Sequence, residues 1–401
     1  MRVMYLTIEG FDTPNANNHL AQTLIKGILD AGKEVYLVQS HRTGEYSDIP
    51  DDLVKYDTLF ADIVDRPVID KGAFVSRYFE GVSYAFKCMK KWRKQRKRID
   101  VVILQATPTS WLTVLLMKVF MRKPIIFSIF DVFPNGAYAF RAIDNKLIYS
   151  ALHLIQRIVY KLSDKIVVIS SDMEQQLINE GIPKDKIETI VNWYDESKIA
   201  EVPKSKNRFI QKYSINDSLF HVQYAGNFGY TFDYKMFLDV AERCKDYTHI
   251  HFDLIGAGGF LETIESEVKT RKLDNITFYP WQPLEIISDV YSACDIQFIP
   301  LSPGVIGNSY PSKASLVMAC GRSFVTTADT STFYARDISE AGIGICVSDK
   351  SPDDAATAII SMYKTPEELA EMQKRALAFV KEKYGSANNV NKFIMLIDNI
   401  K

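Results

Sequence analysis

A lysine stands at the expected start of a helix in the sequence Pro311-Ser312-Lys313, directly after a loop that contains two glycines. A cation in the first turn of a helix is disfavoured by the helix dipole. A bound anion would remove that penalty, because helix N-termini bind phosphate groups and a lysine adds a point charge. We therefore expect Ser312 to cap the helix and Lys313 to bind a phosphate. The alternative is an exposed lysine without a role.

Two glycine-containing turns follow expected strands in the same half of the chain. One is Tyr-Ala-Gly-Asn-Phe-Gly at 224–229, and the other is Gly-Ala-Gly-Gly at 256–259. A turn between a strand and a helix offers backbone N–H groups to an anion. Neither turn has the dinucleotide pattern GxGxxG, since Leu261 stands where the last glycine of the second would be, so NAD is disfavoured. Plain tight turns are the alternative.

In the first half, Asp131 follows an expected strand, and open α/β sheets place active groups at the carboxyl ends of their strands. Asp131 could instead cap the turn before Pro134. The loop 9–19 follows the first strand and carries Asn17 and His19, which could close over a ligand or simply begin a helix. No DxD pair, HExxH, GxSxG or Walker motif occurs, so a metal clamp on a diphosphate is not indicated.

Positive charge is concentrated between residues 71 and 165, which hold 18 Lys and Arg against 5 Asp and Glu. The densest part, 86–98, also carries Phe86, Met89 and Trp92. It can be a solvated helix face, or it can lie on an anionic membrane through Lys90, Lys91, Arg93 and Lys94. Nucleic acid is a weaker interpretation, because no recognition motif accompanies the charge.

The elements that must position these residues alternate between short apolar strands and helices. In the first half we expect strands at 3–8, 34–38, 100–104, 124–129, 165–169 and 186–191. In the second half we expect them at 220–225, 250–255, 276–279, 295–299, 324–327 and 344–347. This alternation predicts two open parallel α/β sheets, with ligand in a cleft between the halves. The polar segment 195–218 is expected to be the linker.

Length and composition fit this organisation, since 401 residues suffice for two domains of about 200 residues each. The 48 Lys and Arg nearly balance 49 Asp and Glu, which excludes a uniformly basic nucleic-acid binder. Five scattered cysteines without CxxC spacing make a zinc site or disulfide framework improbable and fit a reducing compartment. We expect neither a signal peptide nor a membrane span.

Taken in order, the segments of the chain resemble a bacterial family 4 glycosyltransferase of the GT-B fold. The resemblance covers nearly the whole chain and is carried by AGKEV at 31–35, by 165–195, by YAGNFG, by DLIGAGG, by SACDIQFIPL and by PSKASLVMACGRSFVTT. The pairing of GNxG with PSK is most similar to transferases of amino sugars that build O-antigen and capsule repeats.

The resemblance implies two Rossmann-like domains, an acceptor-side domain at 1–200 and a donor-binding domain at 201–385, with a helix at 386–401 packing back on the first. It implies retaining, metal-independent transfer of a hexosyl or N-acetylhexosaminyl group, without a cofactor. The partners would be a nucleotide sugar, a polysaccharide or lipid-linked saccharide acceptor and an anionic membrane surface, but no nucleic acid. The enzyme would be cytoplasmic and peripheral on the inner face of the cell membrane.

Residue by residue, the resemblance implies catalytic roles for Asp131, Lys313 and Asn308. The implied donor-binding residues are Asn227, Phe228, Gly229, Gly256, Trp281, Gln282, Ser309, Ser312 and Lys313. Trp281 and Gln282 fall where the family holds the base. The acceptor side would be formed by Asn17, His19 and Asp131, with Phe130 in place of the family's histidine.

Two departures from the family pattern keep other functions open. Asn308 and Leu316 stand where the family commonly has two glutamates, and a leucine cannot hydrogen-bond a ribose. The arginine and lysine expected after YAGNFG are also not evident, with only Lys235 nearby. The alternatives are a catalytically inactive partner subunit and a sugar-nucleotide epimerase of the same fold.

Overall fold

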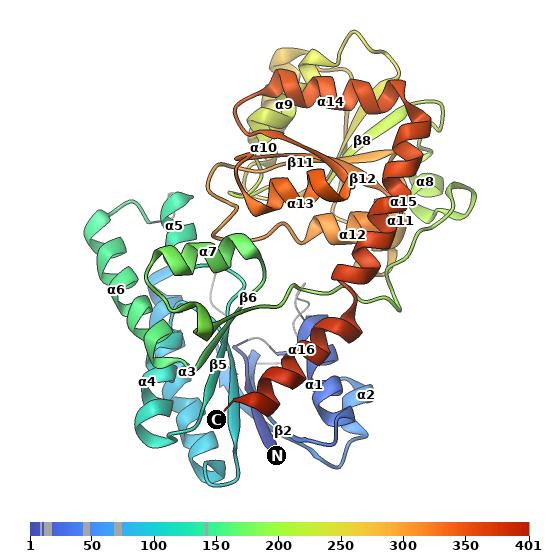
Figure 1. The fold of residues 1–401 in the computed structure, drawn as a ribbon. Helices are drawn as coiled ribbons and strands as arrows, with labels where there is room; N and C mark the ends of the chain where they lie inside the picture. The colour runs from blue at the N-terminus through green and yellow to red at the C-terminus, as the bar shows by residue number, and fades with distance from the viewer. Residues whose placement is uncertain (9, 12–17, 43–48, 68–73, 141–142, 401) are drawn as a thin grey trace. The chain divides into compact units, whose positions relative to one another are not determined.

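The chain folds into two compact units (Figure 1). The computed structural model describes residues 1–8, 10–11, 18–42, 49–67, 74–140 and 143–400. The N-terminal unit consists of Met1–Asn192, Gly307–Ser309 and Ser386–Lys401, and the C-terminal unit consists of Trp193–Ile306 and Tyr310–Gly385. Each unit is built around its own parallel sheet, as the sequence predicts.

The sheet of the N-terminal unit has the order β3-β2-β1-β4-β5-β6-β7 within the described residues. Its central strands are short apolar runs buried on both faces, which is typical of parallel sheets covered by helices. The strands are β1 (Arg2–Leu6), β2 (Glu34–Arg42), β3 (Leu59–Arg66), β4 (Val101–Gln105), β5 (Ile125–Ser128), β6 (Lys165–Val168) and β7 (Ile187–Thr189).

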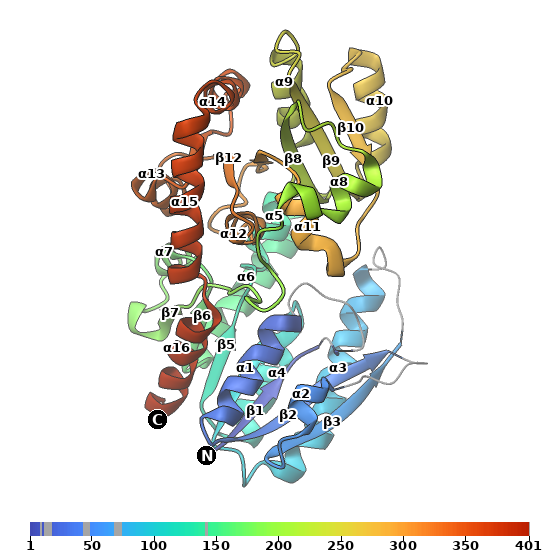
Figure 2. The same ribbon diagram turned by 90° about the vertical axis from the view of Figure 1, so that its right-hand side faces the viewer.

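Helices cover both faces of this sheet (Figure 2). The chain adds β2 and β3 on one side of β1 and β4 to β7 on the other, and right-handed crossovers in opposite directions place their helices on opposite faces. One layer contains α1 (Asn18–Asp30), α2 (Asp51–Val54) and α16 (Ser386–Asn399). The other contains α3 (Phe74–Gln95), α4 (Ser110–Phe120) and α6 (Lys146–Leu162), which pack side by side in that order. Shorter elements are α5 (Asn135–Ala139), α7 (Ser171–Asn179) and the 3-10 turn η1 (Lys184–Lys186).

Helix α16 is held against α1 by a close contact at Gly27. A Cβ atom at Gly27 would lie 2.3 Å from Cγ1 of Val390, so a larger side chain would force the two helices apart. Lys33, just after α1, adds an ion pair to Asp398 at 2.8 Å. These contacts place the last helix of the chain in the N-terminal unit.

The sheet of the C-terminal unit has the order β10-β9-β8-β11-β12-β13 in the part of the chain that the structure describes. Its core is aromatic, with the Phe237 ring stacked on Phe298 at 5.6 Å and edge-on to Phe252 at 5.5 Å. The strands are β8 (Phe220–Asn227), β9 (Ile250–Ala257), β10 (Ile276–Tyr279), β11 (Ile296–Pro300), β12 (Ser323–Ala328) and β13 (Gly344–Ser348). The helices are α8 (Arg208–Tyr213), α9 (Tyr234–Arg243), α10 (Leu261–Arg271), α11 (Ile287–Ser292), α12 (Lys313–Ala319), α13 (Phe333–Ala341), α14 (Pro352–Lys364) and α15 (Pro366–Lys383), with 3-10 turns η2 (Lys204–Lys206) and η3 (Leu284–Ile286).

The polar segment 195–218, which the sequence suggests as a linker, instead belongs to the C-terminal unit. It contains η2 and α8, and α8 is fastened to α11 by Arg208. The backbone N–H of Arg208 donates to Oδ1 of the buried Asp289 at 2.7 Å, and its guanidinium donates to Oδ2 at 2.5 Å. The linker interpretation was wrong because polar groups of this segment are hydrogen-bonded to the C-terminal unit.

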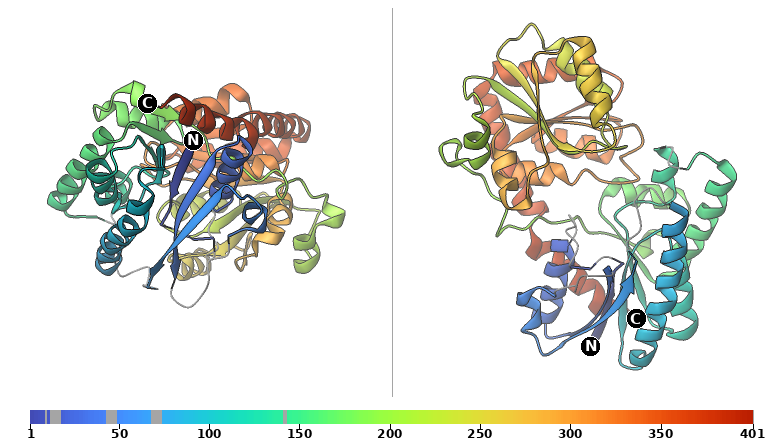
Figure 3. Two further views of the ribbon diagram at one scale, coloured as in Figure 1. Left: turned by 90° about the horizontal axis from the view of Figure 1, so that it is seen from below. Right: turned by 180° about the vertical axis from the view of Figure 1, so that it is seen from behind.

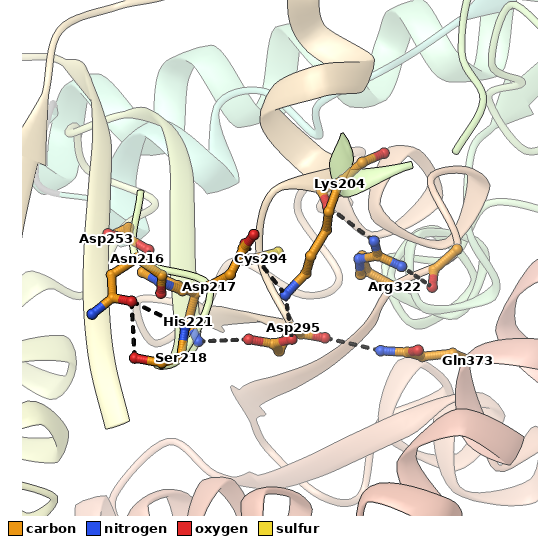
Figure 4. A network of polar contacts seen from close by, with 12 residues as sticks. Lys204, Asn216, Asp217, Ser218, His221, Asp253, Cys294, Asp295, Arg322 and Gln373 are labelled. Carbon is orange, nitrogen blue, oxygen red and sulfur yellow. Dashed lines mark hydrogen bonds and ion pairs between the residues drawn. The ribbon is translucent and has the colours of Figure 1, made fainter. Parts of the chain in front are cut away.

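A polar network lies at the amino-terminal edge of this sheet and centres on His221 of β8 (Figure 4). Nδ1 of His221 lies 2.7 Å from Oδ2 of Asp253, and Nε2 lies 3.0 Å from the carbonyl oxygen of Asn216. A carbonyl oxygen only accepts hydrogen bonds, so Nε2 of His221 carries a hydrogen atom. The contact between Nδ1 of His221 and the carboxylate of Asp253 requires a second hydrogen atom between them. Burial lowers the pKa of His221, but the hydrogen bond and charge of Asp253 outweigh burial and leave that pKa raised.

The raised pKa of His221 makes stability depend on pH in a defined direction. The protonated pair contributes fully to the free energy of unfolding at pH values below the pKa of histidine in the unfolded chain, which is about 6.5. This contribution is lost as the pH rises through the raised pKa of His221 in the folded protein. Between these values the free energy of unfolding should fall by up to about 1.4 kcal/mol per pH unit. Urea unfolding followed by circular dichroism between pH 6 and 9 measures this slope.

A His221→Gln variant should lose that slope and about 3–5 kcal/mol of stability at pH 6, because it removes the cationic hydrogen-bond partner of the buried Asp253 carboxylate. His249→Gln, at an exposed position two residues before His251 of β9, is the matched control. An unchanged pH slope in His221→Gln would contradict the assignment.

Candidate functional site

The turn that ends β8 approaches the turn that ends β9 so closely that only glycine fits. The two strands remain paired as far as Gly226 opposite Gly256 and Asn227 opposite Ala257. A Cβ atom at Gly256 would lie 1.9 Å from the carbonyl oxygen of Gly226, and one at Gly258 would lie 2.4 Å from that of Phe228. The glycines predicted to cradle an anion are therefore required by the contact between the two turns.

The side chain of Lys313 lies across Gly226. A Cβ atom at Gly226 would lie 2.4 Å from Cε and 2.5 Å from Nζ of Lys313, so the absent side chain leaves room for the lysine. In the part of the chain that the structure describes, burial without a compensating carboxylate lowers the pKa of Lys313 to about 7. A buried ammonium group that lacks a counter-charge favours an incoming anion.

Tyr224 holds this lysine in place. Nζ of Lys313 lies 2.5 Å from the Tyr224 hydroxyl and 3.8 Å from the ring centroid. The ring is buried and stacked on Phe232 at 3.9 Å, and the hydroxyl donates to the carbonyl oxygen of Asn227 at 3.1 Å. Tyr224 thus accepts from the lysine and donates to the glycine turn. Sequence reasoning missed it, although residues two apart on a strand share a face, as Tyr224 and Gly226 do.

The remaining residues of the turn divide into exposed and structural positions. Asn227 is exposed, and Gly229 leaves space for its amide, since a Cβ atom at Gly229 would lie 2.6 Å from Nδ2 of Asn227. The ring of Phe228 is fully buried in the core. Its backbone N–H donates to Ala257 and its carbonyl accepts from Phe260, so Phe228 fixes the shape of the turn.

Lys313 is the first residue of α12, as expected, but the expected cap is wrong. Ser312 has helical backbone angles, φ −57° and ψ −20°, and its side chain makes no capping hydrogen bond. Its carbonyl oxygen instead accepts a hydrogen bond from Oγ of Ser315 at 2.8 Å. The exposed Ser312 hydroxyl is therefore left outside the hydrogen bonding of the helix terminus.

Trp281 and Gln282, the two residues expected at the base, have different surroundings in the loop after β10. The Trp281 side chain is 57% exposed and offers its ring to a ligand. Gln282 is buried, and its Nε2 donates to the hydroxyl of Tyr213 at 3.0 Å and to the carbonyl of Pro280 at 2.6 Å. The Gln282 amide thus supports the loop that presents Trp281.

Asp131, Asn308 and Ser309 come together within the N-terminal unit. The backbone N–H of Val132 donates to the carbonyl of Asn308 at 2.7 Å. Burial raises the pKa of Asp131, and a hydrogen bond from Ser309 partly offsets that rise. Because α5 has Pro134 at its N-cap and no side-chain cap, Asp131 does not cap this helix. A carboxylate with a raised pKa is suited to accept a proton.

Asn17 and His19 were predicted to form the acceptor side together with Asp131, and the structure describes only His19 of these two. Asn17 lies outside the described residues. His19 is the second residue of α1, and its carbonyl accepts from Oγ1 of Thr23 at 2.7 Å. Among the described residues no group of three His, Cys, Asp or Glu side chains could hold a metal ion.

Two family models match the chain, one in each half. The model described as Glycosyltransferase Family 4 matches residues 18–198, and the model described as Glycosyl transferases group 1 matches residues 205–379. The probable glycosyltransferase WbjE of Pseudomonas aeruginosa is 24% identical over 280 residues, 69% of this chain and 70% of the relative. The putative colanic acid biosynthesis glycosyl transferase WcaI of Escherichia coli K12 is 24% identical over 191 residues, 47% of this chain and 46% of the relative.

Solved structures share the fold over the full length. Anabaena Alr3699/HepE, solved in complex with UDP and glucose, has a TM-score of 0.73 at 12% identity and covers 100% of both chains. Sucrose-phosphate synthase from Thermosynechococcus elongatus has a TM-score of 0.75 at 12% identity, with 98% of each chain covered. These likenesses confirm the predicted two-sheet fold class.

Tyr224→Phe tests the contact that positions the lysine. It removes the hydroxyl that accepts from Lys313 and keeps the ring stacked on Phe232. We expect the affinity for pyrophosphate, measured by calorimetry, to fall about 10-fold or more, because a hydrogen bond to a charged group contributes about 1.5 kcal/mol or more. Tyr230→Phe, at an exposed tyrosine of the same segment, should change nothing. Equal affinities of the two variants would refute this role of Tyr224.

Proposed function

Because the chain belongs to the family 4 glycosyltransferases of the GT-B fold, which use nucleotide-sugar donors, we propose that it is a retaining, metal-independent enzyme. The sugar it transfers is a hexosyl or N-acetylhexosaminyl group, and the acceptor is a polysaccharide or a lipid-linked saccharide. The printed name of WcaI, a putative colanic acid biosynthesis glycosyl transferase, supports an acceptor of the polysaccharide class.

The observation that carries the proposal is the ammonium group of Lys313, which lies half-buried against Gly226 without a carboxylate partner among the described residues. The leaving group of the transfer is a nucleoside diphosphate, on which negative charge develops as the bond to the sugar breaks. Lys313 and backbone N–H groups of the glycine turn stabilise that charge and take the place of a metal ion. We assign the exposed ring of Trp281 to stacking on the base.

Asp131 is the residue we assign to the acceptor hydroxyl. Desolvation of its carboxyl group by neighbouring atoms raises the pKa of Asp131, and Ser309 hydrogen-bonds this group. Such a carboxylate can orient the hydroxyl or accept its proton. In a retaining transfer the sugar is attacked on the face from which the diphosphate leaves, and the departing oxygen is the other group able to take this proton.

Nucleotide binding without metal tests the donor site. UDP or GDP should raise the melting temperature in the presence of EDTA, and Lys313→Ala should weaken binding about 100-fold, since it removes charged hydrogen bonds to the diphosphate. Lys269→Ala, on the exposed surface of α10, should bind like the wild type. The absence of any shift with any nucleoside diphosphate would overturn the proposal.

The lowered pKa of Lys313 gives the same titration a pH dependence. The diphosphate binds the protonated lysine, and the free protein loses that proton above a pH of about 7. The affinity for UDP should therefore decrease between pH 7 and 9 in the wild type, whereas Lys313→Ala should bind with little pH dependence in this range.

A lipid-linked acceptor would place the enzyme at the inner face of the cell membrane, and the basic helix α3 supports this location. Lys90, Arg93 and Lys94 are exposed and line, with Met89, a surface depression of about 490 Å³. Lys91 differs, because its Nζ lies 3.5 Å from a carboxylate oxygen of Asp62 on β3. Three of the four cations chosen from the sequence thus share one depression. None of the described helices is long and apolar enough to cross a membrane.

Vesicle co-sedimentation tests this contact. The wild type should sediment with phosphatidylglycerol vesicles at low salt, and its binding should weaken as salt rises, because exposed charges are screened. Replacing Lys90, Arg93 and Lys94 by Glu should abolish it. The same replacement of Lys269, Lys350 and Lys381, which are exposed in the C-terminal unit, is the control. Unchanged sedimentation of the first variant would refute the contact.

The departures at Asn308 and Leu316 favour one alternative, a partner subunit that binds the donor without transferring the sugar. Such a protein would show the nucleotide-dependent thermal shift described above and no turnover across a broad set of acceptors. An epimerase of the same fold would convert the donor in the absence of any acceptor.

A further inference from the structure

Three aromatic rings are stacked where the short helix α5 lies beside α6 in the N-terminal unit (Figures 1 and 3). The ring centroids of Tyr138 and Tyr149 are 4.4 Å apart, with 29° between the ring planes, and Tyr149 is stacked in turn on the imidazole of His153 at 5.5 Å. The Tyr149 hydroxyl donates to Oδ1 of Asn135 at 3.4 Å. Tyr138 is 39% exposed although it is stacked, so part of its ring is available to a ligand.

Arg157 continues this line of rings along α6. Tyr149, His153 and Arg157 recur every four residues and therefore share one face of the helix, over about 12 Å at about 1.5 Å per residue. The guanidinium lies beside the end of α7, since a Cβ atom at Gly181 would be 3.6 Å from Nη2. Nε of Arg157 is buried and has no hydrogen-bond partner among the described residues. An unsatisfied buried donor is unfavourable, and a bound anion would satisfy it.

The carboxylate of Glu180, at the end of α7, does not supply that anion, because both of its oxygens have other partners. Oε1 accepts hydrogen bonds from Nδ2 of Asn135 at 2.5 Å and from Nε2 of Gln176 at 3.1 Å. Oε2 lies 3.3 Å from Nε2 of His153. Within the part of the chain that the structure describes, Arg157 forms no ion pair with it or with any other carboxylate. The guanidinium is therefore left for an anion from outside the chain.

These groups together have the chemistry of a site for an acidic saccharide. We name Tyr138, Tyr149, His153 and Arg157 the aromatic–basic row. The C–H bonds of a pyranose ring carry partial positive charge and pack on the negative face of an aromatic ring. The planar guanidinium of an arginine binds a carboxylate or a phosphate through two parallel hydrogen bonds. A row that is longer than one sugar ring and offers both contacts matches a saccharide chain that carries an acidic group.

We propose that the aromatic–basic row binds an acidic saccharide of the acceptor, with its carboxylate or phosphate group held by Arg157. This inference rests on the proposed function, because it assigns a charge to the acceptor saccharide that the function leaves open. The position of the row supports it. Helix α5 begins four residues after Asp131, which we assign to the acceptor hydroxyl, and both belong to the N-terminal unit. The row then holds sugar residues of the acceptor other than the one that reacts.

Matched disaccharides test the preference for acid. Cellobiose, cellobiouronic acid and cellobiose 6′-phosphate differ only in the group at C6′, and saturation-transfer difference NMR measures their affinities for the full-length protein. The wild type should bind one or both acidic disaccharides at least about 10-fold more tightly than cellobiose, because a charged hydrogen bond is gained. The acid that binds more tightly identifies the anion as a carboxylate or a phosphate.

Variants separate the two parts of the row. Arg157→Gln should bind all three disaccharides equally, and Arg157→Lys should keep part of the preference, because a lysine keeps the charge without the fork. Arg96→Gln, at an exposed arginine of the same unit, is the control and should behave like the wild type. Tyr138→Leu should weaken the binding of all three about 3-fold or more, whereas Tyr138→Phe, which keeps the ring, should not.

Equal binding of the three disaccharides by the wild type would overturn the proposal, and so would an unchanged preference in Arg157→Gln. Loss of the UDP-induced thermal shift in Arg157→Gln would also overturn it, because the row would then belong to the donor. A wild type that prefers the acidic disaccharides but shows no thermal shift with any nucleoside diphosphate would support the row and refute the proposed function.

Discussion

The candidate donor site depends on the close approach of the turns that end β8 and β9. Gly226 and Gly256 have no side chains, so the two backbones meet and the absent side chain at Gly226 leaves space for Lys313. The lysine enters this space from α12 and contacts Tyr224, which in turn holds the carbonyl of Asn227. Any side chain at either glycine would separate these parts. One steric constraint thus assembles lysine, tyrosine and turn into a unit for binding an anion.

The sheets were predictable because their central strands are short apolar runs that are buried on both faces, as at Val101–Gln105. Strand β3 was missed for the opposite reason. It lies at the edge of its sheet and is half exposed, and its charged residues Asp62, Asp65 and Arg66 interrupt the apolar ones, so no long apolar run marks it. The segment 195–218 was misread as a linker because its polar residues suggest solvent, whereas Asp289 binds Arg208.

Residues of the candidate site were predictable from the sequence where the backbone conformation requires a particular residue type. They were not predictable where their role depends on contacts with residues distant in the sequence. The glycines are such requirements, and they were found. The cation at the start of α12 was found because the helix dipole disfavours it there unless an anion binds. Tyr224 was missed, because a tyrosine on a buried strand is indistinguishable from core until the lysine beside it is seen. The burial of Gln282 beside the exposed Trp281 likewise follows from Tyr213, a residue of a distant helix.

The N-terminal unit is assembled from three separate pieces of the chain, and its last helix, α16, comes from the final residues. During synthesis β1 and α1 leave the ribosome before the C-terminal unit, whereas the space beside Gly27 that receives Val390 stays unfilled until α16 has emerged after that unit. The C-terminal unit, by contrast, has all its residues available before α16 is made. The N-terminal unit is therefore completed after the C-terminal unit.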